Sequence, residues 1–212
     1  VRLYDDQGTG IHFYTNREDT IADQEMTVEL SRIALQQFKR VIPYLPDMEG
    51  WLGGSLHYID SQGQMMVSAD VQLDDFVYEK SPLGNWSMSG AYLPDGENGH
   101  HVDGFISHNN QEITYLSGIY RVDELGNEDI TGDLELSHFP LKVINPFIPE
   151  RVVEFTGDID GTLSMTGSPM KPNLNGGLKL DSVNMLMPDM SIGFRFDDKQ
   201  VKIADSRMVF DK

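Results

Sequence analysis

The sequence predicts an all-β fold, an elongated and curled antiparallel sheet that carries one or two short helices. Three observations predict this fold. Apolar residues alternate with polar residues along most of the chain, glycine-containing turn sequences separate the alternating segments, and one block of sequence occurs twice. The repeated units could stack into an open, elongated sheet.

The composition excludes several classes of protein. The chain has 212 residues, with 34 acidic against 16 basic residues and a net charge of −18, so it would repel the phosphate backbone of nucleic acids. It has no cysteine, which excludes disulfides, thiolate catalysis and cysteine-bound zinc. No stretch approaches the roughly 18 apolar residues of a membrane-spanning helix. Because the sequence begins and ends in strand-like text, we expect a piece of a longer chain.

The clearest strand lies between residues 65 and 73. Its odd-numbered positions are apolar and its even-numbered positions are mostly polar, which is the pattern of a strand with one buried face. The same alternation predicts strands near residues 85–92, 158–165 and 191–196. Turn residues separate the strands, and we expect turns at 95–96, 97–99, 125–127 and 175–177.

Two segments depart from the strand pattern. Residues 31–45 place apolar side chains at helical spacing, so a helix is predicted there, with Ser31 as its N-cap and Pro43 and Pro46 as its end. Residues 141–149 resemble a shorter helix that Pro146 interrupts. Each helix would cover an end or a gap of the sheet.

The strongest feature is an internal repeat. Residues of the two copies match at an offset of about 107 positions: Gly50 with Gly157, Gly54 with Gly161, Leu56 with Leu163, Val71 with Leu178 and Leu73 with Leu180. The repeated Gly-x-x-x-Gly element indicates close approach of neighbouring backbones. The repeat divides the chain into a partial repeat at 1–46, a first copy at 47–130 and a second copy at 131–212, which together form one continuous domain.

An open sheet with one apolar face must cover that face by a second layer, by curling or with a ligand. The apolar positions are rich in methionine and aromatic residues, which adapt to irregular partners. The residues predicted to line a lipid-binding groove are Met65, Val67, Val71, Leu73, Trp86, Met88, Leu163, Met165, Leu178, Leu180, Phe194 and Phe196. The competing interpretation is that these side chains fill a closed core.

The stretch from Phe155 to Leu180 resembles the repeating unit of the TamB family of translocation and assembly module proteins. The resemblance rests on the spacing of its glycine, proline and leucine residues: Gly157, Gly161, Leu163, Gly167, Pro172, Leu174, Gly176 or Gly177, Leu178 and Leu180. The closing strands at 192–210 are also similar, and the resemblance covers most of residues 26–210. The first copy departs from the pattern, because Ser61-Gln62-Gly63-Gln64 replaces the stretch that ends in proline.

The resemblance implies a fold and a function. TamB-like proteins, with the related AsmA-like bridge proteins, are anchored in the inner membrane of Gram-negative bacteria and cross the periplasm as a sheet curled into an apolar trough, the β-taco. They work with an outer-membrane partner of the TamA type. The resemblance thus implies a periplasmic segment whose cargo is phospholipid, or unfolded β-strands of outer-membrane or secreted proteins.

The residues give little support for catalysis. His100 and His101 are adjacent, so in a strand they would face opposite sides, and a solvated turn is the simpler interpretation. Asp158 and Asp160 begin like a calcium loop, but Pro169 occupies the position of the twelfth ligand. Acidic pairs such as those at 74–75 and 197–198 are expected at solvated strand ends. We therefore expect no enzyme, no metal and no cofactor.

Two alternatives to the lipid groove remain from the sequence. One is a structural or adhesive β-repeat scaffold with a closed core and a protein partner. The other is a carbohydrate-processing β-solenoid enzyme, which needs several carboxylates in one groove, whereas the alternation places the acidic residues on the outer face.

Overall fold

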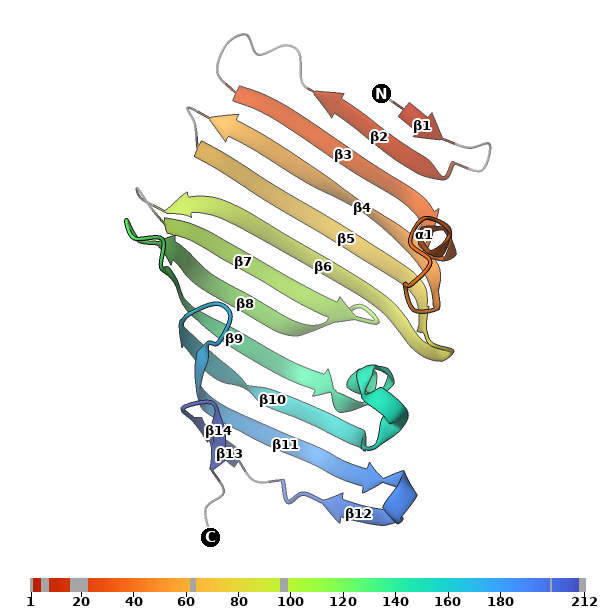
Figure 1. The fold of residues 1–212 in the computed structure, drawn as a ribbon, viewed down its shortest axis with the longest axis vertical. Coiled ribbons are helices and arrows are strands. Elements are labelled where there is room, and N and C mark those ends of the chain that lie inside the picture. The colour runs from red at the N-terminus through yellow and green to blue at the C-terminus, as the bar shows by residue number, and fades with distance from the viewer. Residues whose placement is uncertain are drawn as a thin grey trace. The chain divides into compact units, whose positions relative to one another are not determined.

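Alternating residues form long strands here because an antiparallel ladder pairs every backbone group while it collects the apolar side chains on one face. The computed structural model describes residues 2–4, 8–15, 23–61, 64–95, 99–198 and 200–209. Strands dominate it, and the predicted all-β class, an open antiparallel sheet with short helices, is confirmed (Figure 1). The chain divides into two units, Val1–Gln111 and Glu112–Lys212.

In the first unit each strand pairs with the next one along the chain. The strands are β1 (Arg2–Tyr4), β2 (Gly10–Thr15), β3 (Asp23–Ala34), β4 (Met48–Ser61), β5 (Gln64–Tyr78), β6 (Ser81–Asp95) and β7 (Gly99–His108). This simple up-and-down order follows from the short connections between the strands. One helix, α1 (Gln36–Val41), lies at the end of β3 and β4 (Figure 1).

The second unit repeats this order with shorter final strands. Its elements are β8 (Gln111–Val122), β9 (Glu128–Pro140), the 3-10 helices η1 (Leu141–Phe147) and η2 (Pro149–Arg151), β10 (Glu154–Gly167), β11 (Asn173–Met187), the 3-10 helix η3 (Pro188–Met190), β12 (Ile192–Arg195), β13 (Gln200–Ala204) and β14 (Arg207–Val209). Both β12 and β13 pair with β11, at opposite ends of that strand, and β14 pairs with β13.

The strand pairing reproduces the sequence repeat. The cross-strand pairs between β4 and β5, from Met48–Tyr78 to Ile59–Met66, each have a counterpart between β10 and β11 at the same offset of about 107 positions. The matching pairs include Leu52–Leu73 with Ile159–Leu180, and Gly54–Val71 with Gly161–Leu178. The limits of the sequence repeat, at 46/47 and 130/131, differ from the structural division, which lies between Gln111 and Glu112.

The repeated glycines sit where the backbones come closest. Gly54 has a φ of 147°, and a Cβ at this position would overlap the carbonyl oxygen of Asp70 and lie 3.0 Å from the Val71 Cα. Gly161, with a φ of 151°, meets Leu178 in the same way. A side chain at either position would force the strands apart, so the expectation of close backbone approach is confirmed.

The predicted helix at 31–45 begins later than expected. Ser31 belongs to β3, which pairs with β4 as far as Ala34, and the Leu35 N–H donates to the Gly50 carbonyl at 3.0 Å. The helix therefore starts at Gln36, without a side-chain N-cap. Ile33 and Ala34 pair with Leu52 and Trp51 of β4 after an irregularity of the ladder at Ser31 and Arg32, and this pairing takes the place of the predicted helical turn. The helix ends before Pro43, as predicted.

Other local expectations also need correction. The glycines of the turn predicted at 175–177 lie inside β11, where Gly176 permits close approach to β10. The acidic pair at 74–75 lies within β5, at an irregularity of the β5–β6 pairing rather than at a strand end. His100 and His101 lie in β7, not in a turn. The turn at 125–127 is confirmed, whereas residues 96–98 of the turns predicted at 95–99 lie outside the described residues.

Candidate functional site

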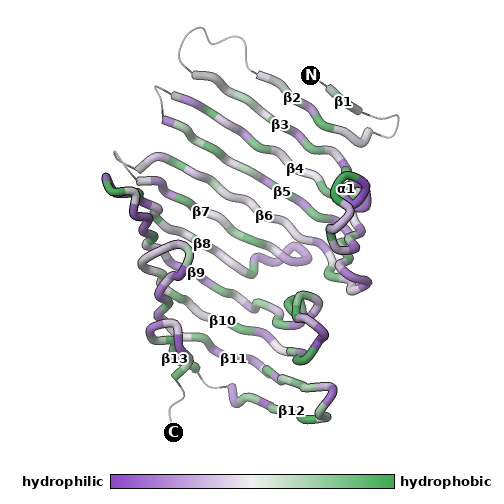
Figure 2. The backbone as a smooth tube through the Cα atoms, viewed as in Figure 1, coloured by the Kyte–Doolittle hydropathy of each residue, from purple (hydrophilic) through white to green (hydrophobic). Residues whose placement is uncertain are grey.

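The predicted lining residues of the first unit share one face of the sheet. Residues directly opposite each other in an antiparallel ladder project on the same side. Val71 lies opposite Met88, and Leu73 lies opposite Trp86. Val67 lies two positions before Ala69 and four before Val71, so it projects on the same side. The alternation is visible along these strands in Figure 2.

The apolar face of the first unit extends to strands that the prediction did not include. Val28 of β3 lies opposite Leu56 of β4, and Phe13 of β2 lies opposite Val28. On the other side of β6, Met88 lies opposite Ile106 of β7. The alternation in β2, β3 and β7 is the sequence signal that would have found these positions.

Much of this face is open to solvent. Phe13 is 42% exposed, Met65 42% and Met88 48%, although each is a large apolar side chain. The fully buried apolar residues of the first unit are Leu35 and Leu83 within the described ranges. Neither lies in the middle of the face, and the described residues provide no second layer over it. Met65 lies at the far end of the face, opposite Asp60.

In the second unit the predicted residues contribute to the best-packed part of the molecule. Leu163 and Leu178 are buried and form a cluster with Val201 and Ile203 of β13. Leu180 packs against this cluster from the same face. Met165 lies opposite Leu174, two pairs along the ladder from Leu163. Val201 and Ile203 were not predicted, although they alternate with Lys202 in the sequence.

The two phenylalanines that were predicted to line the groove, Phe194 and Phe196, lie in different surroundings. Phe194 lies in β12 opposite Met185 and is 47% exposed. Phe196 follows β12, and its N–H donates to the Val183 carbonyl at 2.9 Å. That hydrogen bond brings the Phe196 ring over the second half of β11, where it lines a pocket.

This feature, hereafter the apolar pocket, has a volume of about 260 Å³ and is lined only by apolar side chains. Its floor comes from β10 and β11, one wall from η1, and another wall from Phe196, Val201 and Met208. The lining residues are Leu141, Ile144, Phe155, Ile159, Leu178, Leu180, Val183, Phe196, Val201 and Met208. Leu178, Leu180 and Phe196 were predicted as lining residues. The wall from η1 fits the expectation that the helical segment covers part of the sheet.

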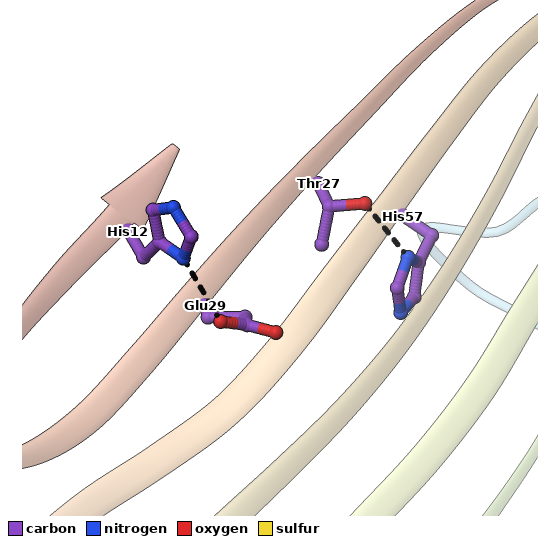
Figure 3. Close-up of polar contacts among 4 residues, drawn as sticks. All are labelled: His12, Thr27, Glu29 and His57. Carbon is purple, nitrogen blue, oxygen red and sulfur yellow. Dashed lines mark hydrogen bonds and ion pairs between the residues drawn. The ribbon is translucent and has the colours of Figure 1, made fainter. Parts of the chain in front are cut away.

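The opposite face of the first unit is mostly polar, although Trp51, Leu93 and Phe105 also lie on it. Asp70 accepts a hydrogen bond from the Ser89 hydroxyl on this face. Nearby, His12 Nδ1 lies 3.2 Å from Glu29 Oε2, and Thr27 Oγ1 lies 3.0 Å from His57 Nδ1 (Figure 3). Each contact bridges two neighbouring strands.

These polar pairs do not form a catalytic relay. A nucleophile needs its base, and the base needs an orienting group, in one connected chain. The carboxylate of Glu29 pairs with His12, whereas the hydroxyl of Thr27 pairs with His57 (Figure 3). Thr27 is 1% exposed, so a substrate cannot reach its hydroxyl. The pairs are best explained as cross-strand contacts that satisfy buried polar groups.

No group of three or more His, Asp or Glu side chains that could hold a metal ion occurs within the described ranges. His100 and His101 lie on opposite sides of β7, and His101 Nδ1 is 3.4 Å from Asp103 Oδ2. Asp160, one of the residues that resembled a calcium loop, accepts a hydrogen bond from the His138 N–H at 2.8 Å. The carboxylate therefore serves the irregular pairing of β9 with β10.

Among the described residues, the pKa values of two carboxylates, Asp47 and Asp123, are clearly shifted, and both residues lie outside the apolar face. A hydrogen bond from Lys39, together with its charge, lowers the pKa of Asp47 and ties α1 to the start of β4. Hydrogen bonds from the side chain and backbone of Asn127 lower the pKa of Asp123 in the turn between β8 and β9. Both groups are structural.

None of the helices in the described parts of the chain has the length and apolar character required to cross a bilayer. Comparisons with protein-family models, with curated proteins and with solved structures gave no match for this chain.

Proposed function

We propose that this chain is a periplasmic segment of a TamB-like, inner-membrane-anchored protein, and that its apolar face carries the acyl chains of phospholipids toward the outer membrane. The parent chain would cooperate with a TamA-like outer-membrane protein. The proposal joins the resemblance of residues 155–180 to the TamB repeat with the chemistry of the apolar face.

One observation carries the proposal. The sheet of the first unit has an apolar face that crosses neighbouring strands, from Phe13 through Leu56 to Met88, and these side chains remain exposed. Continuous exposed apolar patches are rare on monomeric soluble proteins and mark binding surfaces. A closed core would have buried the same residues, so an apolar occupant explains the exposure.

The energetics suit transport rather than tight capture. Each methylene removed from water gains about 0.8 kcal/mol, so a dozen methylenes favour the protein over water by about 10 kcal/mol. A bilayer offers nearly the same gain, so transfer between the bilayer and an apolar face is close to neutral. A flexible lining that includes Met65 and Met88 adapts to chains of different shape.

Two other occupants of this face are considered. One is an apolar strand of an unfolded outer-membrane protein, and the other is a folded protein partner, for which the chain would be a scaffold. Mass spectrometry of organic extracts from the purified chain distinguishes lipid from both. Phospholipid recovered in a defined ratio to protein supports the proposal. Extracts without lipid, together with no binding of a phospholipid carrying a fluorescent tail, contradict it.

A further inference from the structure

The apolar pocket differs from the rest of the apolar face because it has walls. We propose that it is a fixed site for the end of one straight hydrocarbon tail of a lipid, with the polar headgroup outside. The inference rests on the proposed function and adds to it a stationary site in the second unit.

The lining dictates the chemistry of the occupant. All ten lining side chains are apolar, so a polar group inside would lose its hydrogen bonds to water without replacement. The volume of about 260 Å³ exceeds that of a cavity of about 150 Å³, which already accepts benzene. It is slightly below the range of about 300–1,000 Å³ typical of whole drug-sized ligands, so the end of one chain fits better than an entire lipid.

The pocket exists because the second copy departs from the repeat. In the first unit β6 accompanies β5 over most of its length, and Trp86 lies opposite Leu73. In the second unit the described part of the ladder pairs β13 with β11 from Gly176 to Lys179 and β12 with β11 from Asn184 to Met187. Leu180 and Val183, which line the pocket, lie between these two partner strands, whereas in the first unit β6 runs beside Leu73, the counterpart of Leu180.

The wall formed by η1 is held in place. The Asn145 side chain donates to the Phe155 carbonyl at 2.8 Å and accepts from the Phe155 N–H at 2.8 Å, so it pairs with the start of β10 as a neighbouring strand would. Val143 of η1 is buried. Leu141 and Ile144 therefore remain over the pocket, while Phe155 forms part of its floor. Asn145 is thus a positioning residue for η1, which caps the pocket.

The repeat supplies a matched control for the test. Ile144 of η1 corresponds to Phe38 of α1, which lies outside the apolar pocket. The probe is a fluorescent straight-chain fatty acid, titrated into the purified chain with its stoichiometry measured. We expect the indole of Ile144→Trp to occupy part of the pocket and to exclude about two methylenes of the fatty-acid chain. The affinity of the pocket for the fatty acid should then fall by about tenfold. Phe38→Trp should leave this binding unchanged.

Met208→Trp provides a second variant, because Met208 lines the same pocket and is 64% exposed, so a larger side chain there does not require a rearranged core. Circular dichroism verifies that each variant is folded. Loss of one binding site per chain in the folded pocket variants supports the inference. Wild-type binding by folded Met208→Trp and Ile144→Trp chains overturns it.

Failure of the pocket inference is distinguishable from failure of the proposed function. If phospholipid is recovered from the purified chain but the pocket variants retain all fatty-acid binding, only the fixed site is wrong. If the wild-type chain binds neither phospholipid nor fatty acid, the proposed function and the pocket inference fail together.

Discussion

Gly161 in β10 lies directly opposite Leu178 in β11, and a Cβ at position 161 would lie 3.0 Å from the Leu178 Cα. Gly54 and Val71 repeat this relationship in the first unit. In both copies the glycine lets its strand approach a residue of the apolar face. The repeat therefore preserves a backbone geometry as well as a hydrophobic pattern.

Replacing Gly54 by alanine should destabilise the chain by about 3 kcal/mol or more, because the new Cβ overlaps the Asp70 carbonyl oxygen and the φ of 147° disfavours any side chain. Gly53→Ala is the control, since a Cβ there has its nearest neighbour at 3.7 Å. Chemical denaturation measures both. Equal stability of the two variants would show that the close approach is not required.

Thr27→Val should cost about 1 kcal/mol of unfolding free energy. The hydroxyl of Thr27 is buried against His57 Nδ1 at 3.0 Å, and valine keeps the shape while removing the hydrogen bond. Thr131→Val, at an exposed position of β9, is the control and should change stability little. A stability of Thr27→Val at or above that of the wild type would contradict a structural role for the contact.

Asn145→Ala should free η1 from the start of β10. Both hydrogen bonds to Phe155 are lost, so its half-buried backbone N–H loses this partner and its protection from solvent exchange. Hydrogen exchange should show faster exchange of the Phe155 amide, while the amides of β4 and β5 in the first unit stay unchanged. Unaltered exchange at Phe155 would mean that Asn145 does not hold the cap.

The turn between β8 and β9 should respond to acid in a defined direction. Hydrogen bonds from Asn127 lower the pKa of Asp123, so the ionised carboxylate stabilises the folded turn above the ordinary Asp pKa of about 3.9. This stabilisation is lost as the pH falls through the lowered folded-state pKa. Asn127→Ala should raise the pKa of Asp123 toward its ordinary value, as measured by carboxyl NMR titration. An unchanged Asp123 pKa would reject this cause.

Period-two alternation was sufficient to predict the all-β fold and to place Val71 and Leu73 on the same side. Side-chain direction in a strand is a local property, so one sequence is enough to read it. The glycines at 176–177 were wrongly predicted as a turn, because a local pattern does not show which strand lies beside it. A turn and a close approach both favour glycine, and only the pairing partner distinguishes them.

The apolar pocket could not be predicted from sequence patterns. It depends on how β12 and β13 pair with different parts of β11 and on the position of η1, and both are set by contacts between residues distant in the chain. The helical pattern at 31–35 failed for a related reason, because Ile33 and Ala34 pair with β4 instead of beginning a helix. Tertiary pairing overrode local propensity at both places.

The most direct measurement is photo-crosslinking to lipid. One variant carries a photo-crosslinking amino acid at Leu178, and a second carries it at Lys179, the neighbouring residue on the other face. Each purified chain is incubated with phospholipid vesicles. Val71 and its neighbour Asp70, which faces the other side of β5, are the two positions tested in the first unit. Lipid adducts at positions 71 and 178, with few at 70 and 179, are the predicted result. Adducts that are confined to positions 70 and 179, or absent from all four, would contradict a lipid-carrying apolar face.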